Sequence, residues 1–273
     1  MNRTMQMLRA CKALFWIQLR DGLQYRLAAL AGASTSIFWA LIEVTVFRVF
    51  FQYAQGYQSA LTLPQAVAWV WLGQFLFVMH PSMDGEIYKK ITTGDVAGEL
   101  LRPLDLYAHW FARITGRRLS SLLTRGLVCL AAGVLMPAGW GMLPPDSPGA
   151  MLCFILSLVS ALLLCSAYEM LMVSLCMNVR TGYSPANALL LLGGVLSGSY
   201  LPLMLWPDFM QGFLLIQPFA GYLDIPARLY LGLMAPESLP GALALQLGWT
   251  VLFVLVGRMG MSRRLRKIVV QGG

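Results

Sequence analysis

Residues Asp84 to Arg118 read DGEIYKKITTGDVAGELLRPLDLYAHWFARITGRR, and this polar stretch separates two strongly apolar parts of the chain. Eleven of its 35 residues are charged. Charged side chains are costly inside hydrocarbon, so the stretch does not cross a membrane. We expect it to fold against a membrane surface or against another protein.

The glycine, proline and aspartate residues of this stretch predict where three short helices begin and end. Gly94 can end the first helix, because glycine adopts the left-handed C-terminal conformation without steric cost. Asp95 can open the second as an N-cap. Pro103 stops that helix, and Asp105 can cap the third. The third helix has an apolar face, formed by Tyr107, Trp110, Phe111 and Ile114.

Two interpretations of the stretch remain open. It is either a solvated loop that ends in an interfacial helix, or a docking element for a cytosolic partner. Its charges of both signs favour a protein partner, because the anionic cytosolic leaflet would favour a uniformly basic loop. The candidate docking residues are Lys89, Lys90, Asp95, Glu99, Arg102 and Asp105.

The composition predicts an all-α, polytopic membrane protein. The 273 residues are 58% hydrophobic and 12% charged, and the mean hydropathy is +0.66. A soluble domain has about 25% charged residues. The net charge of +8 does not indicate nucleic-acid binding, because the basic residues are confined to particular loops. The five cysteines form no CxxC pair, so we interpret them as small hydrophobic residues without disulfides.

Six apolar blocks are long enough to cross a membrane, since a crossing helix needs about 20 residues. They are residues 27–51, 64–83, 119–136, 149–174, 186–206 and 241–261. The first block is too long for a cleavable signal peptide. Residues 1–26 precede it and predict an amphipathic interfacial helix. The apolar face of that helix consists of Leu8, Cys11, Phe15, Leu19 and Leu23.

The basic residues predict the orientation. With six crossings, 18 of the 20 Lys and Arg residues fall on one side, and only Arg48 and Arg228 on the other. The positive-inside rule then places both termini, the 84–118 stretch and the basic tail 262–273 in the cytosol. The segment 200–240 contains six of the 14 prolines, and its apolar runs 209–216 and 227–234 are too short to cross. We predict two short re-entrant or interfacial helices there, on the outer side.

Few residues suggest chemistry. No GxxxxGK[ST] or HExxH pattern occurs, and the only histidines are His80 and His109. Metal and catalytic sites are therefore not predicted. Glu43 and Glu169 lie within predicted spans, about 16 Å apart in depth, so they should not form a dyad. For Glu43, a structural hydrogen bond and a role in transport are equally compatible with the sequence. The candidate residues of a translocation path are Glu43, Glu169, Ser197 and Tyr200.

These features together resemble the permease subunit of a bacterial type-2 ABC exporter. The resemblance covers the six spans, the N-terminal helix, the cytosolic helical loop and the proline-broken helices before the last span. Two short motifs strengthen it, the sequence GELLRP at 98–103 and the sequence IVVQGG at 268–273. The glycines of a GxxxG pair in the fifth block, Gly194 and Gly198, allow close helix contact but are common in membrane chains.

The resemblance implies a permease of the bacterial inner membrane that works with a separate ATPase and a second permease, identical or paralogous. It implies that residues 89–102 are a coupling helix seated on that ATPase. No cofactor is expected in this chain, because ATP and magnesium would be bound by the ATPase. A lipid-like or amphipathic substrate would suit the apolar spans. A secondary transporter remains an alternative, although no internal repeat is visible. A channel or an intramembrane enzyme is a further alternative, although neither a charge ring nor a catalytic pair is evident.

Overall fold

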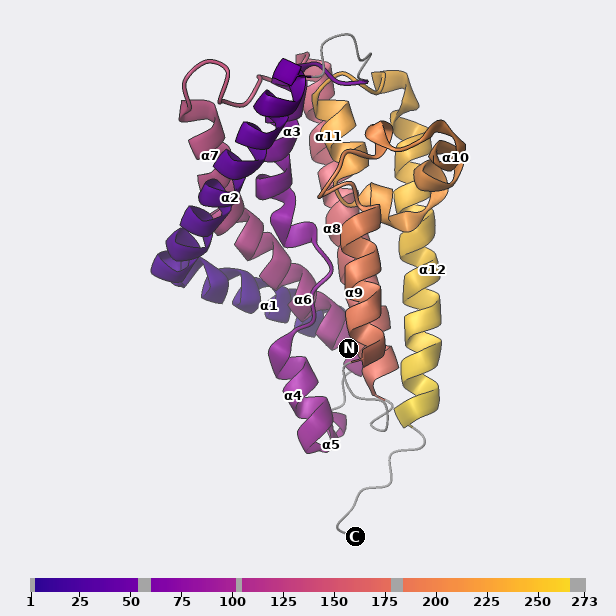
Figure 1. The fold of residues 1–273 in the computed structure, drawn as a ribbon. Helices are drawn as coiled ribbons and strands as arrows, with labels where there is room; N and C mark the ends of the chain where they lie inside the picture. The colour runs from indigo at the N-terminus through magenta and orange to yellow at the C-terminus, as the bar shows by residue number, and fades with distance from the viewer. Residues whose placement is uncertain (1–2, 54–59, 102–104, 178–183, 266–273) are drawn as a thin grey trace.

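The computed structural model describes residues 3–53, 60–101, 105–177 and 184–265, and every regular element in these ranges is helical (Figure 1). The long α-helices are α1 (Arg3–Gln24), α2 (Arg26–Tyr53), α3 (Leu63–Phe75), α6 (Leu106–Ser121), α8 (Pro148–Cys176), α9 (Ser184–Leu196) and α12 (Leu239–Leu265). The shorter ones are α4 (Gly85–Thr93), α5 (Val96–Leu100), α7 (Leu127–Leu135), α10 (Asp208–Ile216) and α11 (Asp224–Tyr230). A π-helical segment, η2 (Leu122–Gly126), joins α6 to α7, and 3-10 turns are η1 (Leu76–Met79), η3 (Leu203–Leu205), η4 (Pro218–Gly221) and η5 (Pro236–Ser238).

Four helical stretches within the described residues are long and apolar enough to cross a membrane, which identifies a multi-pass membrane protein. They are Arg26–Tyr53, Leu106–Leu135, Pro148–Cys176 and Pro236–Leu265. A fifth apolar stretch, Leu63–Met79, is shorter. The six-crossing arrangement therefore stays a prediction.

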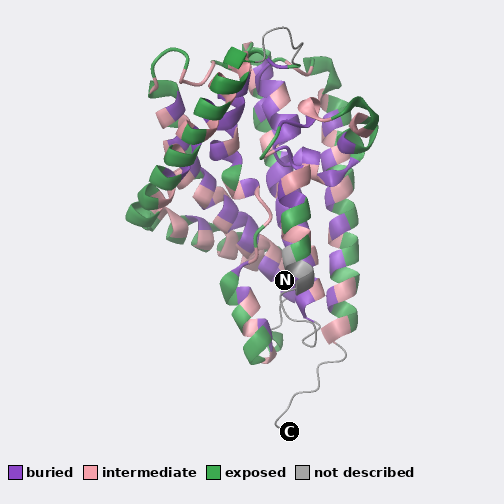
Figure 2. Ribbon diagram, in the orientation of Figure 1, coloured by how far each residue is buried: buried purple, intermediate pink, exposed green. Residues whose placement is uncertain are grey.

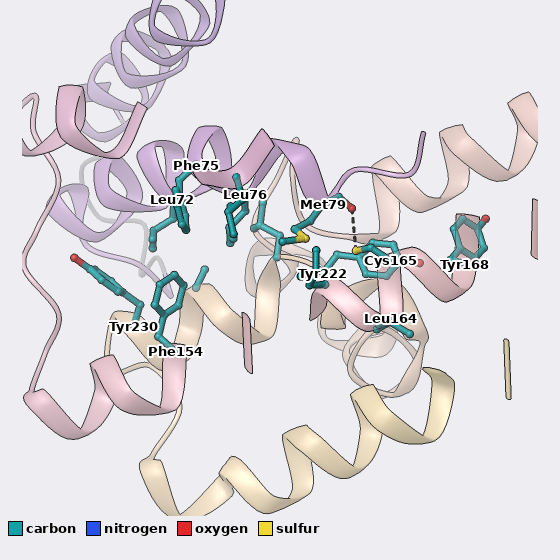
Figure 3. Packing of buried hydrophobic residues seen from close by; sticks show 14 of the residues in the cluster. Leu72, Phe75, Leu76, Met79, Phe154, Leu164, Cys165, Tyr168, Tyr222 and Tyr230 are labelled. Atoms are coloured by element: carbon teal, nitrogen blue, oxygen red, sulfur yellow. Dashed lines mark hydrogen bonds between the residues drawn. The ribbon is translucent and has the colours of Figure 1, made fainter. Parts of the chain in front are cut away.

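The main core surrounds α8, the most buried of the long apolar helices. α12 packs along it, and α11 covers part of its length. Figure 3 shows Tyr168 and Cys165 of α8 beside Tyr222, with Met79 of η1 close by. The Cys165 thiol donates to the Met79 carbonyl oxygen at 3.1 Å, so the end of η1 is tied to the centre of α8. All five cysteines are free thiols.

The predicted third short helix and the predicted third span are one continuous helix. We expected a helix after Asp105 and a separate crossing at 119–136. Instead, α6, η2 and α7 run without a break from Leu106 to Leu135. No proline interrupts these residues, and a helix interior without proline keeps its hydrogen-bond ladder.

Two predicted spans are shorter than expected. Helical structure in the second block ends at Met79, not at residue 83, because Pro81 holds His80 in an extended conformation with ψ of 140°. In the fifth block, α9 ends at Leu196 instead of continuing to residue 206. Gly198 has φ of +82° there, and Pro202 follows, so the helix stops. By contrast, α12 ends at Leu265, four residues after the predicted end of the sixth block at residue 261.

The proline-rich segment forms short helices, as predicted, with one shift. α10 agrees with the predicted run 209–216. The second helix is α11, which begins three residues before the predicted run 227–234, and Gly232 with φ of +67° follows its end.

The N-terminal helix packs against α6. A Cβ atom on Gly116 would lie 2.7 Å from the Phe15 carbonyl oxygen, and one on Gly22 would lie 2.0 Å from Ser120 Oγ. Glycine is therefore favoured at both positions, because Gly116 packs against the backbone of Phe15 and Gly22 packs against the side chain of Ser120. Of the predicted apolar face, Leu19 is buried, Cys11, Phe15 and Leu23 are half-buried, and Leu8 is exposed, so the face begins at Cys11 rather than at Leu8.

Candidate docking and translocation sites

Helices α4 and α5 project from the same end of the molecule as the last turn of α12 (Figure 1). Asp84 caps α4, because its carboxylate accepts hydrogen bonds from the backbone N–H groups of Glu86 and Ile87 at 2.9 and 3.2 Å. Gly94 ends α4 in the left-handed conformation, with φ of +81°, as predicted. Asp95 was expected to cap α5, but its side chain bonds no backbone amide there. It accepts a hydrogen bond from the Thr93 hydroxyl instead.

One acidic side chain fixes the position of α5. Glu99 forms an ion pair with Lys90 of α4 and accepts a hydrogen bond from the indole of Trp110 in α6, at 2.5 Å. Burial opposes ionisation of Glu99, but the hydrogen bonds from Lys90 and Trp110 outweigh it and hold its pKa below the ordinary value. Asp105, as predicted, caps α6 through the Ala108 N–H at 2.8 Å, and it pairs with Arg258 of α12.

The inner face of this projection is packed and its tip is exposed. Ile87, Ile91 and Val96 are buried against a cluster that includes Trp110 and Met170. Much of the tip is exposed (Figure 2). Lys89, Asp95, Leu100 and Leu101 are exposed there, and the exposed fraction of Leu101 is 87%. The predicted docking residue Arg102 lies outside the described residues, as does Pro103, which was predicted to stop the second short helix. Of the predicted docking residues that the structure describes, Lys90, Glu99 and Asp105 form ion pairs within the chain. Lys89 and Asp95 are exposed, as are Leu100 and Leu101.

An ion network lies behind the projection, where α6 meets α8. Glu169 of α8 is fully buried and pairs with Arg117 at 2.9 Å and with Arg118 at 2.6 Å. Asp84 lies 3.4 Å from Arg117 and 3.5 Å from Arg113. Burial opposes ionisation of Asp84, but the two arginines and the capping amides lower its pKa. The network thus links the start of α4 to the middle of α6 and to α8.

A small cavity of about 80 Å³ contains Glu43. Gln74 of α3 lines the same cavity. Ser199 and Tyr200, which follow α9, line the same cavity. Of the four predicted path residues, the fold therefore brings Glu43 and Tyr200 together. Ser197 is buried nearby and hydrogen-bonds Ser199 at 2.6 Å, whereas Glu169 belongs to the ion network described above.

A larger cavity of about 540 Å³ lies between the α1–α2 junction, the end of η1 and the α6–η2 helix. Its basic residues are Arg117, Arg118 and Arg125. Phe77 and His80 line both this cavity and the Glu43 cavity. Their ring centroids are 4.9 Å apart, and Tyr200 lies 6.4 Å beyond His80. These three rings separate a basic cavity from an acidic one.

Phe77, Gln74 and Arg125 line these cavities but were not predicted as site residues. A signal existed for Arg125, because it is the last charge before 20 uncharged residues, 126–145. Phe77 had no such signal, since aromatic residues are common in apolar helices. Among the described residues, no group of three or more His, Cys, Asp or Glu side chains could hold a metal ion.

The family comparison agrees with this membrane architecture. A family model described as ABC-2 family transporter protein matches residues 37–272. No curated protein and no solved structure matches the chain.

Proposed function

Because the chain belongs to the ABC-2 family of transporter proteins, a family of ABC transporter membrane components, we propose that it is an export permease coupled to a separate ATP-binding subunit. The projection formed by α4 and α5 is the observation that supports this proposal most strongly. It has a fixed shape, a packed inner face and an exposed tip with two adjacent leucines.

The tip has the composition of a protein-docking surface. Exposed neighbouring apolar residues on a small projection are typical of interaction sites, and Lys89 and Asp95 would supply complementary charge around Leu100 and Leu101. A hydrogen bond from the Trp110 indole to the Glu99 carboxylate connects α5 to α6. A push on α5 would therefore move α6 rather than deform the loop.

The continuous helix from Leu106 to Leu135 extends this coupling route. ATP-driven closure of the ATPase would displace α4 and α5, and α6 would transmit the displacement to η2 and α7. The π-helical segment η2 borders the basic cavity, and such segments occur frequently at functional sites. The ATPase can bias the permease only if it binds the two conformations with different affinities.

The path would pass the rings that separate the two cavities. In one conformation Phe77, His80 and Tyr200 keep the Arg125-containing cavity apart from the Glu43 cavity, and a shift of η1 would join them. Substrate would then move from the basic side towards Glu43. An amphipathic molecule suits this sequence of polar and aromatic surfaces.

The remaining parts of the proposal concern topology and assembly. We propose six crossings, both termini in the cytosol, a bacterial inner-membrane location and a second permease, identical or paralogous. The distribution of basic residues supports this orientation. ATP and magnesium would be bound by the partner ATPase and not by this chain.

The proposal is tested by co-expression with a candidate ATP-binding subunit and reconstitution into liposomes. We expect the two chains to copurify and fluorescent amphiphile transport to require hydrolysable ATP. Transport driven by a proton gradient without ATP would contradict the proposal and would favour a secondary transporter.

A further inference from the structure

Within the part of the chain that the structure describes, Arg125 differs from the other arginines of the large cavity because it has no acidic partner. Arg117 and Arg118 pair with Glu169. The Arg125 Nε and Nη2 atoms donate to Ser36 Oγ at 3.2 and 2.6 Å, and its Cζ lies 4.5 Å from the centre of the Phe77 ring. Within the described ranges no salt bridge includes Arg125, and no hydrogen bond uses its Nη1.

The fold leaves room beside this guanidinium. The cavity of about 540 Å³ lies beside it. Gly32 of α2 packs closely against the Arg125 side chain, because a Cβ atom there would lie 3.4 Å from Arg125 Cδ and 3.7 Å from its Nη1. Ser82, Ser121 and Thr124 add hydroxyl groups to the lining. The lining also has an apolar and aromatic part, formed by Tyr25, Ala28, Ala29, Phe77, Val78 and Pro81. A surface of this kind suits a charged group attached to a hydrocarbon chain.

The position of Arg125 in the helix adds a second observation. It lies in the π-helical segment η2, directly before the uncharged residues 126–145. An arginine at the border of an apolar span is costly unless it reaches water, another polar group or an anion. Arginine also binds phosphate and carboxylate groups through two parallel hydrogen bonds.

We propose that this cavity binds the phosphate or carboxylate head group of an anionic alkyl amphiphile through Arg125. The alkyl chain lies along Ala28 and Ala29 of α2, next to the exposed side chains of Leu27 and Leu30. The identification of this amphiphile as cargo rests on the proposed export function, whereas its binding does not. A cationic amphiphile is disfavoured, because Arg117, Arg118 and Arg125 all line the cavity.

Binding is tested on the full-length chain purified in an uncharged detergent, with dioctanoyl phosphatidic acid as the probe. We expect the probe to raise the thermal midpoint in a saturable manner. Arg125→Gln should weaken the apparent affinity by about tenfold or more, because a charge-assisted contact is lost. Arg125→Lys should retain part of the affinity, since the charge remains.

Arg48→Gln is the matched control. Arg48 also stacks on an aromatic ring, with its Cζ 4.6 Å from the Trp140 centroid, and it donates to the Gly139 carbonyl oxygen. It does not line the cavity, so its substitution should leave binding unchanged. Ala28→Phe should weaken binding while Arg125 is retained, because the exposed Ala28 position borders the chain-binding wall. Equal affinity of the parent and the Arg125→Gln variant would contradict the proposal.

Two further probes test the ligand class. Dioctanoyl phosphatidylcholine should bind much more weakly, because its choline group places a positive charge near the three arginines. Inorganic phosphate should compete only at far higher concentration, because it lacks the chain. Equal binding of phosphatidylcholine would overturn the anionic class, and equal binding of phosphate would overturn the amphiphile.

The role as cargo is tested separately in proteoliposomes that contain the ATPase. Arg125→Gln should lower ATP-dependent transport of a fluorescent phosphatidic acid at limiting substrate, whereas Arg48→Gln should leave this transport unchanged. If binding depends on Arg125 but transport does not, the site holds a membrane lipid and the cargo assignment is wrong. If no ATP-dependent transport occurs with any substrate, the export function itself fails, and the binding result still stands.

Discussion

Arg118 of α6 and Glu169 of α8 form an ion pair that is closed to solvent. The Nη2–Oε2 distance is 2.6 Å, and the side chains are 3% and 0% exposed. The same guanidinium donates to the carbonyl oxygens of Val78 and His80, at 2.6 and 3.2 Å. Those acceptors are left without helical partners where η1 ends. Arg118 therefore holds three elements together beneath the large cavity.

Replacing Glu169 with Gln should strongly destabilise the protein. Arg117 and Arg118 would lose their shared carboxylate, and breaking a buried pair from one side typically costs about 3–5 kcal/mol. The thermal midpoint in detergent measures the effect. Glu237→Gln is the control, because Glu237 is exposed in η5. Equal midpoints for the two variants would contradict a stabilising role for the network.

The Asp84 cap should make stability depend on pH in acid. Burial opposes its ionisation, but Arg117 and Arg113 lower its pKa below the ordinary value of 3.8. A carboxyl group with a lowered pKa stabilises the fold above its ordinary value, and this contribution is lost as the pH falls through the folded value. Asp84→Asn should therefore unfold at a lower temperature than the parent at about pH 6, and the difference should shrink below about pH 4. A difference that stays constant with pH would exclude this explanation.

Glu43 should affect transport more than folding. It lines a cavity together with Gln74, and Glu43→Gln preserves the shape of the side chain while removing its charge. We expect the export rate to fall by about tenfold, because the loss of one charge-assisted hydrogen bond has a free energy that corresponds to about this factor. Thermal midpoints and gel-filtration profiles serve as folding controls. Unchanged export by a normally folded variant would leave Glu43 with a structural hydrogen bond only.

The orientation of the chain predicts the accessibility of single cysteines. A cysteine at Thr93, in the α4 tip, should react with a membrane-impermeant thiol reagent only from the cytosol. Cysteines at Pro145 and Met234 should react only from outside. The parent for these variants would carry Ser in place of its five cysteines. Labelling of Thr93 from outside would reverse the proposed orientation.

Local features of the chain were predictable because their causes are local. Gly94 and Asp105 act as expected, since a glycine C-cap and an aspartate N-cap depend on neighbouring residues only. The break between α6 and α7 was predicted wrongly, because the change from polar to apolar composition at residue 119 was interpreted as a change of element. A helix tolerates such a change when no proline or glycine cap interrupts it.

Tertiary partners were less accessible to prediction. The mixed charges of residues 84–118 were interpreted as contacts for another protein, yet Glu99 pairs with Lys90, and Asp84 lies close to Arg113 and Arg117. A sequence shows the signs of these charges but not their distances. Phe77 lines both cavities because η1 packs against η2. The spacing of apolar residues along the sequence does not predict this contact between two separate segments.

The proposed docking of an ATP-binding subunit on α4 and α5 can be measured by copurification of that subunit with the permease. The test variant replaces Leu100 and Leu101 with Ala at the exposed tip. The control is Leu135→Ala at the end of α7, far from α5 in Figure 1, because Leu135 is 83% exposed and Leu101 is 87% exposed.

The tagged permease variants should be purified at equal amounts, and the ATP-binding subunit bound to each should be quantified. We predict a loss of about tenfold or more for the tip variant, as expected for apolar residues at the centre of an interface. The Leu135→Ala variant should retain the parental amount. Equal recovery of the subunit with the tip variant and with the control would contradict the docking role of α4 and α5.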